Sequence, residues 1–362
     1  MDIALIGLPS SGKTTLLKAL AAGHLPSGST SPNEATLSVV KVPDERLEKL
    51  ATLVGAKKTT YLEQRIHDFP GFSVGKKGPP AQLLGQLQTA DLLVHVVHAF
   101  DDASTPHPLE SIDPARDIEA LDLELALADL GVIERRIERL KAESRSLAAA
   151  NRGPQEREMA LLTRLKEGLE NEKPVREAGL TPEEKTLLGG FNLLTGRPML
   201  IVLNINESDA PKSAEIEAKA KADFAAPERG VVAIAVKSEA DVAELDAEEA
   251  AEFRKDLELP ETPAAERMLQ EAVSLLGLIT FYTAGPQDTH AWSIPAGTNA
   301  QKAAGRIHSD IERGFIRAEV MGWMDLLEAG SHAEAKKKGL LRLEGKTYEM
   351  QDGDVINVLF NV

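Results

Sequence analysis

Short apolar runs alternate with amphipathic segments along the chain as far as about Leu278. The runs have the length and composition of buried strands, and we expect strands at Asp2–Ile6, Leu37–Val42, Leu92–Val97, Met199–Asn204 and Val231–Val236. After the first of them, Thr14–Leu20 places leucines at helical spacing. Strands that alternate with helices indicate a mostly parallel sheet with both faces covered. This part of the chain is therefore expected to form an α/β domain.

The pattern changes over about Pro114–Thr195. Within Asp117–Ser146, Leu and Ile recur every three or four residues and dense charge lies on the other face, as on an amphipathic helix. A break at Asn151–Pro154 precedes a second helical stretch that ends near Leu169. We predict an α-helical coiled-coil hairpin inserted into the α/β domain. A charged helix pair is usually a solvated, packed structure, and a partner-binding role is the alternative.

After Leu278 the segments become shorter and mixed. The strand candidates are Ile279–Thr283, Ala291–Ile294, Leu341–Leu343 and Val355–Asn361, and the clearest helix is Asn299–Gly314. This mixture is typical of a small α+β module. We therefore predict an α/β domain built from residues 1–113 and 196–278, a helical insertion at 114–195, and a C-terminal α+β domain at 279–362.

Composition narrows the class of protein. The 362 residues are 43% apolar and include no cysteine, so the chain can form hydrophobic cores but neither disulfides nor thiolate metal sites. No apolar run is long enough for a membrane-spanning helix, since Leu92–Phe100 is the best candidate and contains two histidines. We expect a cytoplasmic monomer with no membrane partner.

The net charge of −16 argues against a protein that coats nucleic acid through general electrostatics, and no DNA specificity is evident. The charge is unevenly spread, because Ile279–Val362 contains nine Lys/Arg against eleven Asp/Glu. Any RNA contact is therefore expected in this C-terminal part or on local basic faces.

Residues Gly7–Thr14 read GLPSSGKT and match the phosphate-loop pattern G-x-x-x-x-G-K-[ST]. The motif lies between a predicted strand and a predicted helix. Such a turn points successive backbone N–H groups at one position, where the positive end of the helix dipole also stabilises a polyphosphate. Lys13 would reach the β and γ phosphates, and the Thr14 hydroxyl would ligate Mg²⁺. A glycine turn without a ligand is the alternative.

A second motif, Asp68-Phe69-Pro70-Gly71, fits the pattern D-x-x-G. Asp68 would hold Mg²⁺ through water, and the Gly71 N–H would contact the γ phosphate. An ordinary Asp-Pro-Gly turn is the alternative.

The base is expected at the end of the run Met199–Asn204, which continues as Asn204-Ile205-Asn206-Glu207. GTPases that resemble this fold use N-K-x-D there, and the Asp accepts hydrogen bonds from guanine N1–H and N2. Here Ile205 removes the Lys, and Glu207 places its carboxylate one methylene further out. Selectivity for guanine should fall. A chance Asn/Glu loop at a strand end is the alternative.

Four long segments show a wider resemblance: Val42–Leu50, Asp117–Leu130, Thr280–Val320 and Glu344–Val362. On these segments, and over nearly its whole length, the chain resembles the Obg-like ATPases known as YchF. The resemblance implies a TRAFAC-class P-loop NTPase domain, a helical coiled-coil insertion and a C-terminal TGS domain of β-grasp form. It also implies a preference for ATP over GTP, which accompanies N-x-x-E in that family.

The resemblance also suggests further site residues. It aligns His107 with a histidine proposed to assist hydrolysis. It places Phe72 where many GTPases have the Gln that orients the attacking water, and because a phenyl ring cannot form those hydrogen bonds, slow hydrolysis is expected.

The chain departs from the family pattern at three places. Ser10 and Ser11 replace the usual Asn-Val pair, which leaves the monovalent-cation dependence open. The segment that corresponds to switch I, around residues 31–40 (SPNEATLSVV), is altered. Thr36 is therefore the candidate second Mg²⁺ ligand, and Thr30 is its rival. Ala235-Val236-Lys237 stands where a Ser-Ala segment usually contacts the base.

Together these arguments assign three classes of residue. The catalytic candidates are Lys13, Gly71 and His107, and the metal ligands are Thr14, Thr36 and Asp68. The nucleotide-binding candidates are Pro9, Ser10, Ser11, Gly12, Lys13, Thr14, Thr15, Asn204, Ile205, Glu207, Val236 and Lys237.

The leading hypothesis is a slow, Mg²⁺-dependent ATPase, with GTP as a possible second substrate, that acts as a conformational switch on a ribosome or RNA partner. The alternative is a ribosome- or RNA-binding module whose nucleotide site is vestigial or structural. A small-molecule kinase would share the phosphate loop but would not be expected to have the TGS-like end.

Overall fold

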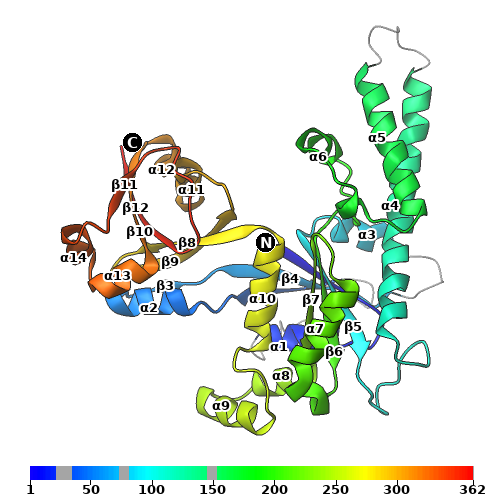
Figure 1. Cartoon of the computed structure of the whole chain (residues 1–362), viewed down its shortest axis with the longest axis horizontal. Coiled ribbons are helices and arrows are strands. Elements are labelled where there is room, and N and C mark those ends of the chain that lie inside the picture. The colour runs from blue at the N-terminus through cyan, green and yellow to red at the C-terminus, as the bar shows by residue number, and fades with distance from the viewer. Residues whose placement is uncertain (22–34, 73–80, 145–152, 362) are drawn as a thin grey trace. The chain divides into compact units, whose positions relative to one another are not determined.

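The computed structural model describes residues 1–21, 35–72, 81–144 and 153–361. They form two compact units (Figure 1). The first unit contains Met1–Val40 and Arg65–Glu271, and the second contains Lys41–Gln64 and Ala272–Val362. The chain therefore leaves the first unit, returns to it, and leaves it again.

The first unit is built on a six-stranded sheet in the order β2-β4-β1-β5-β6-β7. The strands are β1 (Asp2–Ile6), β2 (Thr36–Lys41), β4 (Glu63–Asp68), β5 (Leu92–Ala99), β6 (Met199–Ile205) and β7 (Arg229–Ile234). From β4 to β7, neighbouring strands are parallel. Every residue of β6 is buried, as expected of a central strand covered on both faces. The prediction of a mostly parallel α/β sheet is confirmed.

Helices cover this sheet and extend from it. They are α1 (Lys13–Leu20), α3 (Ala81–Leu87), α4 (Pro114–Ser144), α5 (Gly153–Glu170), α6 (Pro182–Leu188), α7 (Ser213–Phe224), α8 (Val236–Val242), α9 (Ala247–Asp256) and α10 (Ala264–Leu275), with short 3₁₀ turns at Val175–Glu177 and Glu207–Lys212. Helix α8 begins at Val236, where a strand was predicted to end, so that strand is two residues shorter at this end than expected.

Helices α4 and α5 lie side by side as the predicted hairpin (Figure 1). Buried Ile133, Ile137 and Leu140 of α4 pack with leucines of α5. This spacing of four and three residues gives one apolar stripe facing the partner helix. The hairpin belongs to the first unit rather than to a compact unit of its own.

The second unit has a mixed six-stranded sheet in the order β11-β10-β12-β8-β9-β3. Its strands are β3 (Thr59–Thr60), β8 (Leu278–Ala284), β9 (Thr289–Pro295), β10 (Phe315–Gly322), β11 (Arg342–Glu344) and β12 (Asp354–Phe360). Its helices are α2 (Glu45–Val54), α11 (Ala300–Ile307), α12 (Ser309–Arg313), α13 (Trp323–Ala329) and α14 (His332–Lys337). Strand β10 was not predicted, because an irregularity between Phe315 and Arg317 interrupts its alternation.

The division into units differs from the predicted domains at two places. The second unit already begins at Ala272, before the predicted start at residue 279. The sequence analysis placed all of residues 1–113 in the α/β domain, yet Lys41–Gln64 belongs to the second unit. Leu47 and Leu50 of α2 are buried with Tyr282 and Met321 of the second unit. Strand β3 also pairs in parallel with β9. These long-range contacts decide the membership of the segment.

Candidate functional site

The loop between β1 and α1 has the backbone conformation that its glycines predict. Gly7 and Gly12 have positive φ angles of 146° and 97°. A Cβ added to Gly12 would lie 2.3 Å from the side-chain nitrogen of Asn204, so only glycine fits this position without a shift. Ser10 also has a positive φ of 61°, a conformation that costs a non-glycine residue roughly 1 kcal/mol. The loop is therefore a tight turn that packs directly against the end of β6.

Lys13 is buried at the start of α1. Its Nζ donates to the carbonyl oxygens of Leu8 at 2.8 Å and Gly7 at 3.2 Å. Burial lowers the pKa of Lys13 to about 8, and the nearby Asp68 carboxylate opposes that shift. An anion beside Nζ would stabilise the charged form, and the phosphates of a nucleotide would supply one.

Thr14 and Asp68 meet beside this lysine. The Thr14 hydroxyl donates to Asp68 Oδ2 at 2.5 Å, and Asp68 Oδ1 is buried with no hydrogen-bond partner among the described residues. Burial raises the pKa of Asp68, while the Thr14 hydrogen bond and Lys13 oppose the shift. These oxygens fit Mg²⁺, which prefers hard oxygen ligands and keeps several from water and phosphate. In the described part of the chain, no group of three or more His, Cys, Asp or Glu side chains is suited to hold a metal.

Gly71 lies against the phosphate loop. A Cβ added there would lie 2.5 Å from the Pro9 nitrogen, so the close approach requires glycine. The next residue, Phe72, donates its N–H to the Gly7 oxygen at 3.0 Å, and its ring is buried in the core with Ile6. The D-x-x-G segment therefore rests directly on the loop Gly7–Thr14.

Asn204 joins the phosphate loop to the segment that begins α8. Its Nδ2 donates to the Ser11 oxygen at 3.0 Å, and its Oδ1 accepts from the Val236 N–H at 3.3 Å. Three residues later, Glu207 accepts from Lys237 Nζ at 3.3 Å and from the Ser238 hydroxyl at 3.4 Å. Asn204 is buried, whereas the Glu207 side chain is 47% exposed. Asn204 therefore holds the phosphate loop and the start of α8 together, and Glu207 is exposed enough to contact a ligand.

The phosphate loop, the start of α1 and the base motif line a cavity of about 640 Å³, whereas Asp68 and Gly71 do not line it. This volume lies within the usual range for small-molecule sites. Of the predicted residues, those that line it are Ser10, Ser11, Gly12, Lys13, Thr14, Thr15, Asn204, Ile205, Glu207 and Lys237. Pro9 and Val236 do not line it: Pro9 contacts Gly71, and Val236 is buried beneath the site.

The sequence analysis missed one wall of the cavity. It is formed by Phe100, Asp101, Asp102, Ser104 and Thr105, together with Asn206. Asn206 Oδ1 accepts from the Asp101 N–H at 2.8 Å and so joins this wall to the base motif. Because β5 and β6 are parallel neighbours, the loops after both strands meet at the same edge of the sheet. That topological rule could have identified the wall.

His107 and Thr36 do not line the cavity. The His107 Nε2 contacts Asp117 Oδ2 at 2.7 Å, its Nδ1 accepts from the Leu109 N–H at 3.1 Å, and its side chain is only 3% exposed. Both ring nitrogens are therefore occupied, and a catalytic role, which stays a prediction, would require these contacts to break. Thr36 begins β2, and its role as a metal ligand also stays a prediction. Its rival, Thr30, lies outside the described residues.

Comparisons with known proteins agree with this geometry. Residues 278–361 match the family model YchF-GTPase_C, described as "Protein of unknown function (DUF933)". Over 372 residues the chain is 39% identical to the ribosome-binding ATPase YchF of Bacillus subtilis, with 100% of both proteins covered. It is 36% identical to the ribosome-binding ATPase YchF of Escherichia coli O157:H7, with 99% of this chain and 98% of that protein covered. The chain belongs to the YchF family.

A solved structure supports the same conclusion. The Schizosaccharomyces pombe YchF GTPase superposes with a TM-score of 0.83 at 25% identity, covering 99% of this chain and 97% of that one. This member of the YchF family thus has a P-loop NTPase domain, an inserted helical hairpin and a C-terminal TGS-like α+β domain, as the sequence predicted. Within the described ranges, helices long and apolar enough to cross a bilayer are absent.

Proposed function

We propose that this protein binds ATP·Mg²⁺, hydrolyses it slowly, and acts as a nucleotide-dependent switch on the ribosome. The main support is the cavity in which the phosphate loop, with Lys13 and Thr14, opens toward Asn204–Glu207. A triphosphate would bind along the loop and its base would reach the strand end. The relatives named as ribosome-binding ATPases support the partner and the nucleotide.

The preference for adenine rests on the base motif. Ile205 lines the cavity with an apolar side chain where a Lys would stand in N-K-x-D, and Glu207 has the longer carboxylate. Phe100, on the opposite wall, stacks on His98 with ring centroids 3.8 Å apart. These apolar surfaces suit a purine ring, and the site lacks the Asp of N-K-x-D that would select guanine.

Slow hydrolysis follows from the residue after D-x-x-G. The Phe72 ring is buried in the core, so it offers the attacking water no hydrogen-bonding group. An activator in the partner would then be needed for fast turnover.

Titration calorimetry with Mg²⁺·ATP and Mg²⁺·GTP tests the substrate. We expect ATP to bind more tightly, and tenfold tighter binding of GTP would contradict the proposal. Single-turnover hydrolysis with and without ribosomes tests the chemistry, with Lys13→Ala as the inactive reference. If neither condition gives cleavage, the protein is a binding module whose nucleotide site is structural.

One surface favours a direct contact with ribosomal RNA. Arg135, Arg136 and Arg139 of α4 line a hollow of about 410 Å³ with Glu158 and Phe191. Glu158 is bound by Arg136 through two hydrogen bonds of 2.7 and 2.9 Å. Exposed Arg135 and Arg139 are four residues apart, where like charges destabilise a helix by a few tenths of a kcal/mol. In a chain of net charge −16, this local excess of positive charge suits backbone phosphates.

The RNA contact has its own test. Replacing Arg135 and Arg139 with Gln should weaken ribosome binding and reduce its salt dependence, while nucleotide affinity is unchanged. Binding that is insensitive to salt between 50 and 200 mM would exclude an electrostatic contact. A ribosome partner would also place the protein in the cytoplasm, which fractionation can check.

A further inference from the structure

The segment Lys41–Gln64 links two neighbouring strands of the first unit's sheet through the second unit. It begins at the end of β2 and finishes within β4, and the order β2-β4-β1 makes these strands neighbours. The Val42 N–H donates to the Leu62 oxygen at 2.8 Å, so the two ends of the segment are joined where it leaves the sheet. Between those ends lie α2 and β3, which belong to the second unit.

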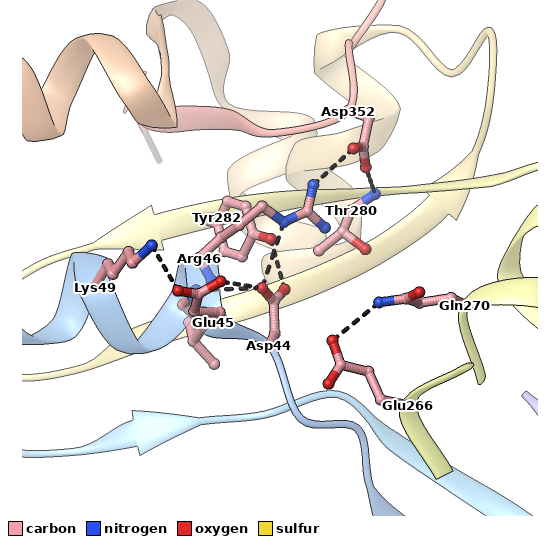
Figure 2. Close-up of polar contacts among 10 residues, drawn as sticks. Asp44, Glu45, Arg46, Lys49, Glu266, Gln270, Thr280, Tyr282 and Asp352 are labelled. Atoms are coloured by element: carbon pink, nitrogen blue, oxygen red, sulfur yellow. Dashed lines mark hydrogen bonds and ion pairs between the residues drawn. The ribbon is translucent and has the colours of Figure 1, made fainter. Parts of the chain in front are cut away.

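Four polar side chains, here called the clamp, fasten this segment to β8 and the turn before β12 (Figure 2). They are Asp44, Arg46, Tyr282 and Asp352. The Tyr282 hydroxyl donates to Asp44 Oδ2 at 2.6 Å, and Arg46 Nη1 donates to Asp352 Oδ2 at 2.7 Å. The other Asp352 oxygen accepts from the Thr280 N–H at 2.9 Å. The Arg46 guanidinium lies 5.4 Å from the centre of the Tyr282 ring.

The Tyr282–Asp44 pair of the clamp is largely removed from water, whereas the Arg46 and Asp352 side chains are 30% and 53% exposed. Tyr282 is fully buried, and the Asp44 side chain is 12% exposed. Burial raises the pKa of Tyr282, and the Asp44 carboxylate raises it further, so the hydroxyl remains a donor over the physiological pH range. A hydrogen bond to a charged group is stronger than one between neutral groups. Asp44 also caps α2 by accepting the Arg46 N–H at 3.0 Å, so it joins helix geometry to docking.

Further contacts show that the segment is an integral part of the second unit. The Lys57 N–H donates to the Pro286 oxygen at 3.1 Å, and the Thr60 hydroxyl donates to Asp288 at 2.9 Å. Leu50 is fully buried in the core of the same unit. Movement of the segment relative to this unit would break all of these contacts together.

The two strands that bound this segment also lead to the proposed metal site. Strand β2 starts at Thr36, and β4 ends at Asp68, whose carboxylate accepts the Thr14 hydroxyl. We propose that the clamp is a positioning device for the nucleotide site. It ties the strand that begins at Thr36 and the strand that ends at Asp68 to the C-terminal unit, and so couples that unit to the bound nucleotide. This inference rests on the proposed function, since it concerns regulation of the same site.

The direction of the effect follows from where the two nucleotides differ. ATP has the γ phosphate that the Gly71 N–H is proposed to contact beside the Mg²⁺ ligands Thr36 and Asp68, and ADP lacks this phosphate. Loosening the clamp should therefore weaken ATP binding more than ADP binding. Coupling between two sites is reciprocal, so ATP should also slow hydrogen exchange in α2 and β3.

The experiment uses the full chain with Tyr282→Phe, which removes the hydroxyl but keeps the ring. Tyr348→Phe is the matched control, because its hydroxyl donates to Asp354 Oδ2 at 3.0 Å and Arg342 lies 5.7 Å from its ring centre. The control pair lies in the same unit and does not involve Lys41–Gln64. We expect Tyr282→Phe to lower the ratio of ATP to ADP affinity by roughly three- to tenfold. Tyr348→Phe should leave the ratio unchanged.

Three outcomes are decisive. An unchanged ratio in Tyr282→Phe, or an equal change in the control, would overturn the inference and leave the proposed function intact. Failure of the unmodified chain to bind ATP would overturn both. If Tyr282→Phe does not fold, Asp352→Asn replaces it. This variant keeps an acceptor for the Thr280 N–H and removes the charge that pairs with Arg46. Its ratio of ATP to ADP affinity then tests the inference. ATP-dependent exchange protection of α2 must also decrease, which a purely structural role would not require.

Discussion

The hydroxyl of Thr14 and the carboxylate of Asp68 are 2.5 Å apart, although 54 residues separate them in the chain. The hydrogen bond occupies the two oxygen-bearing groups that are proposed to hold Mg²⁺. Because a hydroxyl has lone pairs as well as its proton, Thr14 could ligate Mg²⁺ while it still donates to Asp68. The bond would then join the phosphate loop to D-x-x-G in the metal-bound site as well.

Asp68→Asn should separate folding from metal binding. Asn keeps an acceptor for Thr14, and because burial raises the pKa of Asp68, the charged form opposes folding at neutral pH. We expect unchanged or higher thermal stability without nucleotide, but loss of the Mg²⁺-dependent gain in ATP affinity. Titration of ATP with and without Mg²⁺ measures this gain in affinity. Asp91→Asn, which alters an acceptor for the Asp2 N–H at 2.8 Å, is the control.

ATP binding should take up a proton at alkaline pH. The pKa of Lys13 is about 8 in the free protein, and bound phosphates would raise it. At pH 9 the lysine is largely neutral before binding, so ATP affinity should fall above pH 8. Calorimetry in two buffers of different ionisation heat counts the protons taken up. Lys18→Ala, which removes a partly exposed lysine of the same helix that pairs with Glu244, should retain the proton uptake. Absence of uptake in the unmodified chain would contradict the assignment.

The same pKa shift predicts a change in stability. The pKa of about 8 in the folded protein lies below the ordinary lysine pKa of 10.5, so the unfolded chain binds more protons between these limits. Lys13 should therefore make unfolding of the nucleotide-free protein harder as the pH rises from about 8 toward 10.5. Denaturant unfolding across this range, with Lys13→Met as the reference, isolates that contribution.

Local patterns were sufficient to predict most of the fold. The runs that became β1, β5 and β6 are mostly apolar, and the stripe on α4 follows helical periodicity, so neither signal depends on distant residues. The membership of α2 could not be predicted in this way. Its amphipathic pattern shows that one face is buried, but not which core covers it. Only the contacts of Leu47 and Leu50 with the second unit decide that.

The site shows the same limit. Glycine and lysine positions in Gly7–Thr14 predicted the loop geometry because the turn restricts which residues fit. The wall at Phe100–Thr105 has no motif, and only the neighbouring positions of β5 and β6 bring it to the cavity. The catalytic role of His107 was predicted from resemblance, and no pattern in the chain indicates that Asp117 contacts its ring.

Gly71→Ala should disturb the site more than the fold. A Cβ there would lie 2.5 Å from the Pro9 nitrogen, so the two loops must separate. We expect ATP affinity to fall at least tenfold, with ADP less affected because it lacks the γ phosphate. Gly85→Ala is the control, since a Cβ at Gly85 meets nothing within 4 Å among the described residues. It should leave binding unchanged and, in a helix, stabilise the chain by about 0.5–1 kcal/mol.

The two ends of the base motif should respond differently to removal. Asn204→Ala leaves the Ser11 oxygen and the Val236 N–H without their buried partner, which costs about 1–3 kcal/mol of stability. Asn204→Ala should weaken the binding of ATP and of GTP by a similar factor, because it loosens the loop that both nucleotides use.

Glu207→Ala removes a half-exposed side chain whose ion pair with Lys237 contributes little, so stability should change by less than about 0.5 kcal/mol. The ratio of ATP to GTP affinity should instead move toward one. Chemical denaturation and competitive nucleotide titration of both variants measure the two effects, and a large stability loss in Glu207→Ala with unchanged selectivity would assign it a structural role instead.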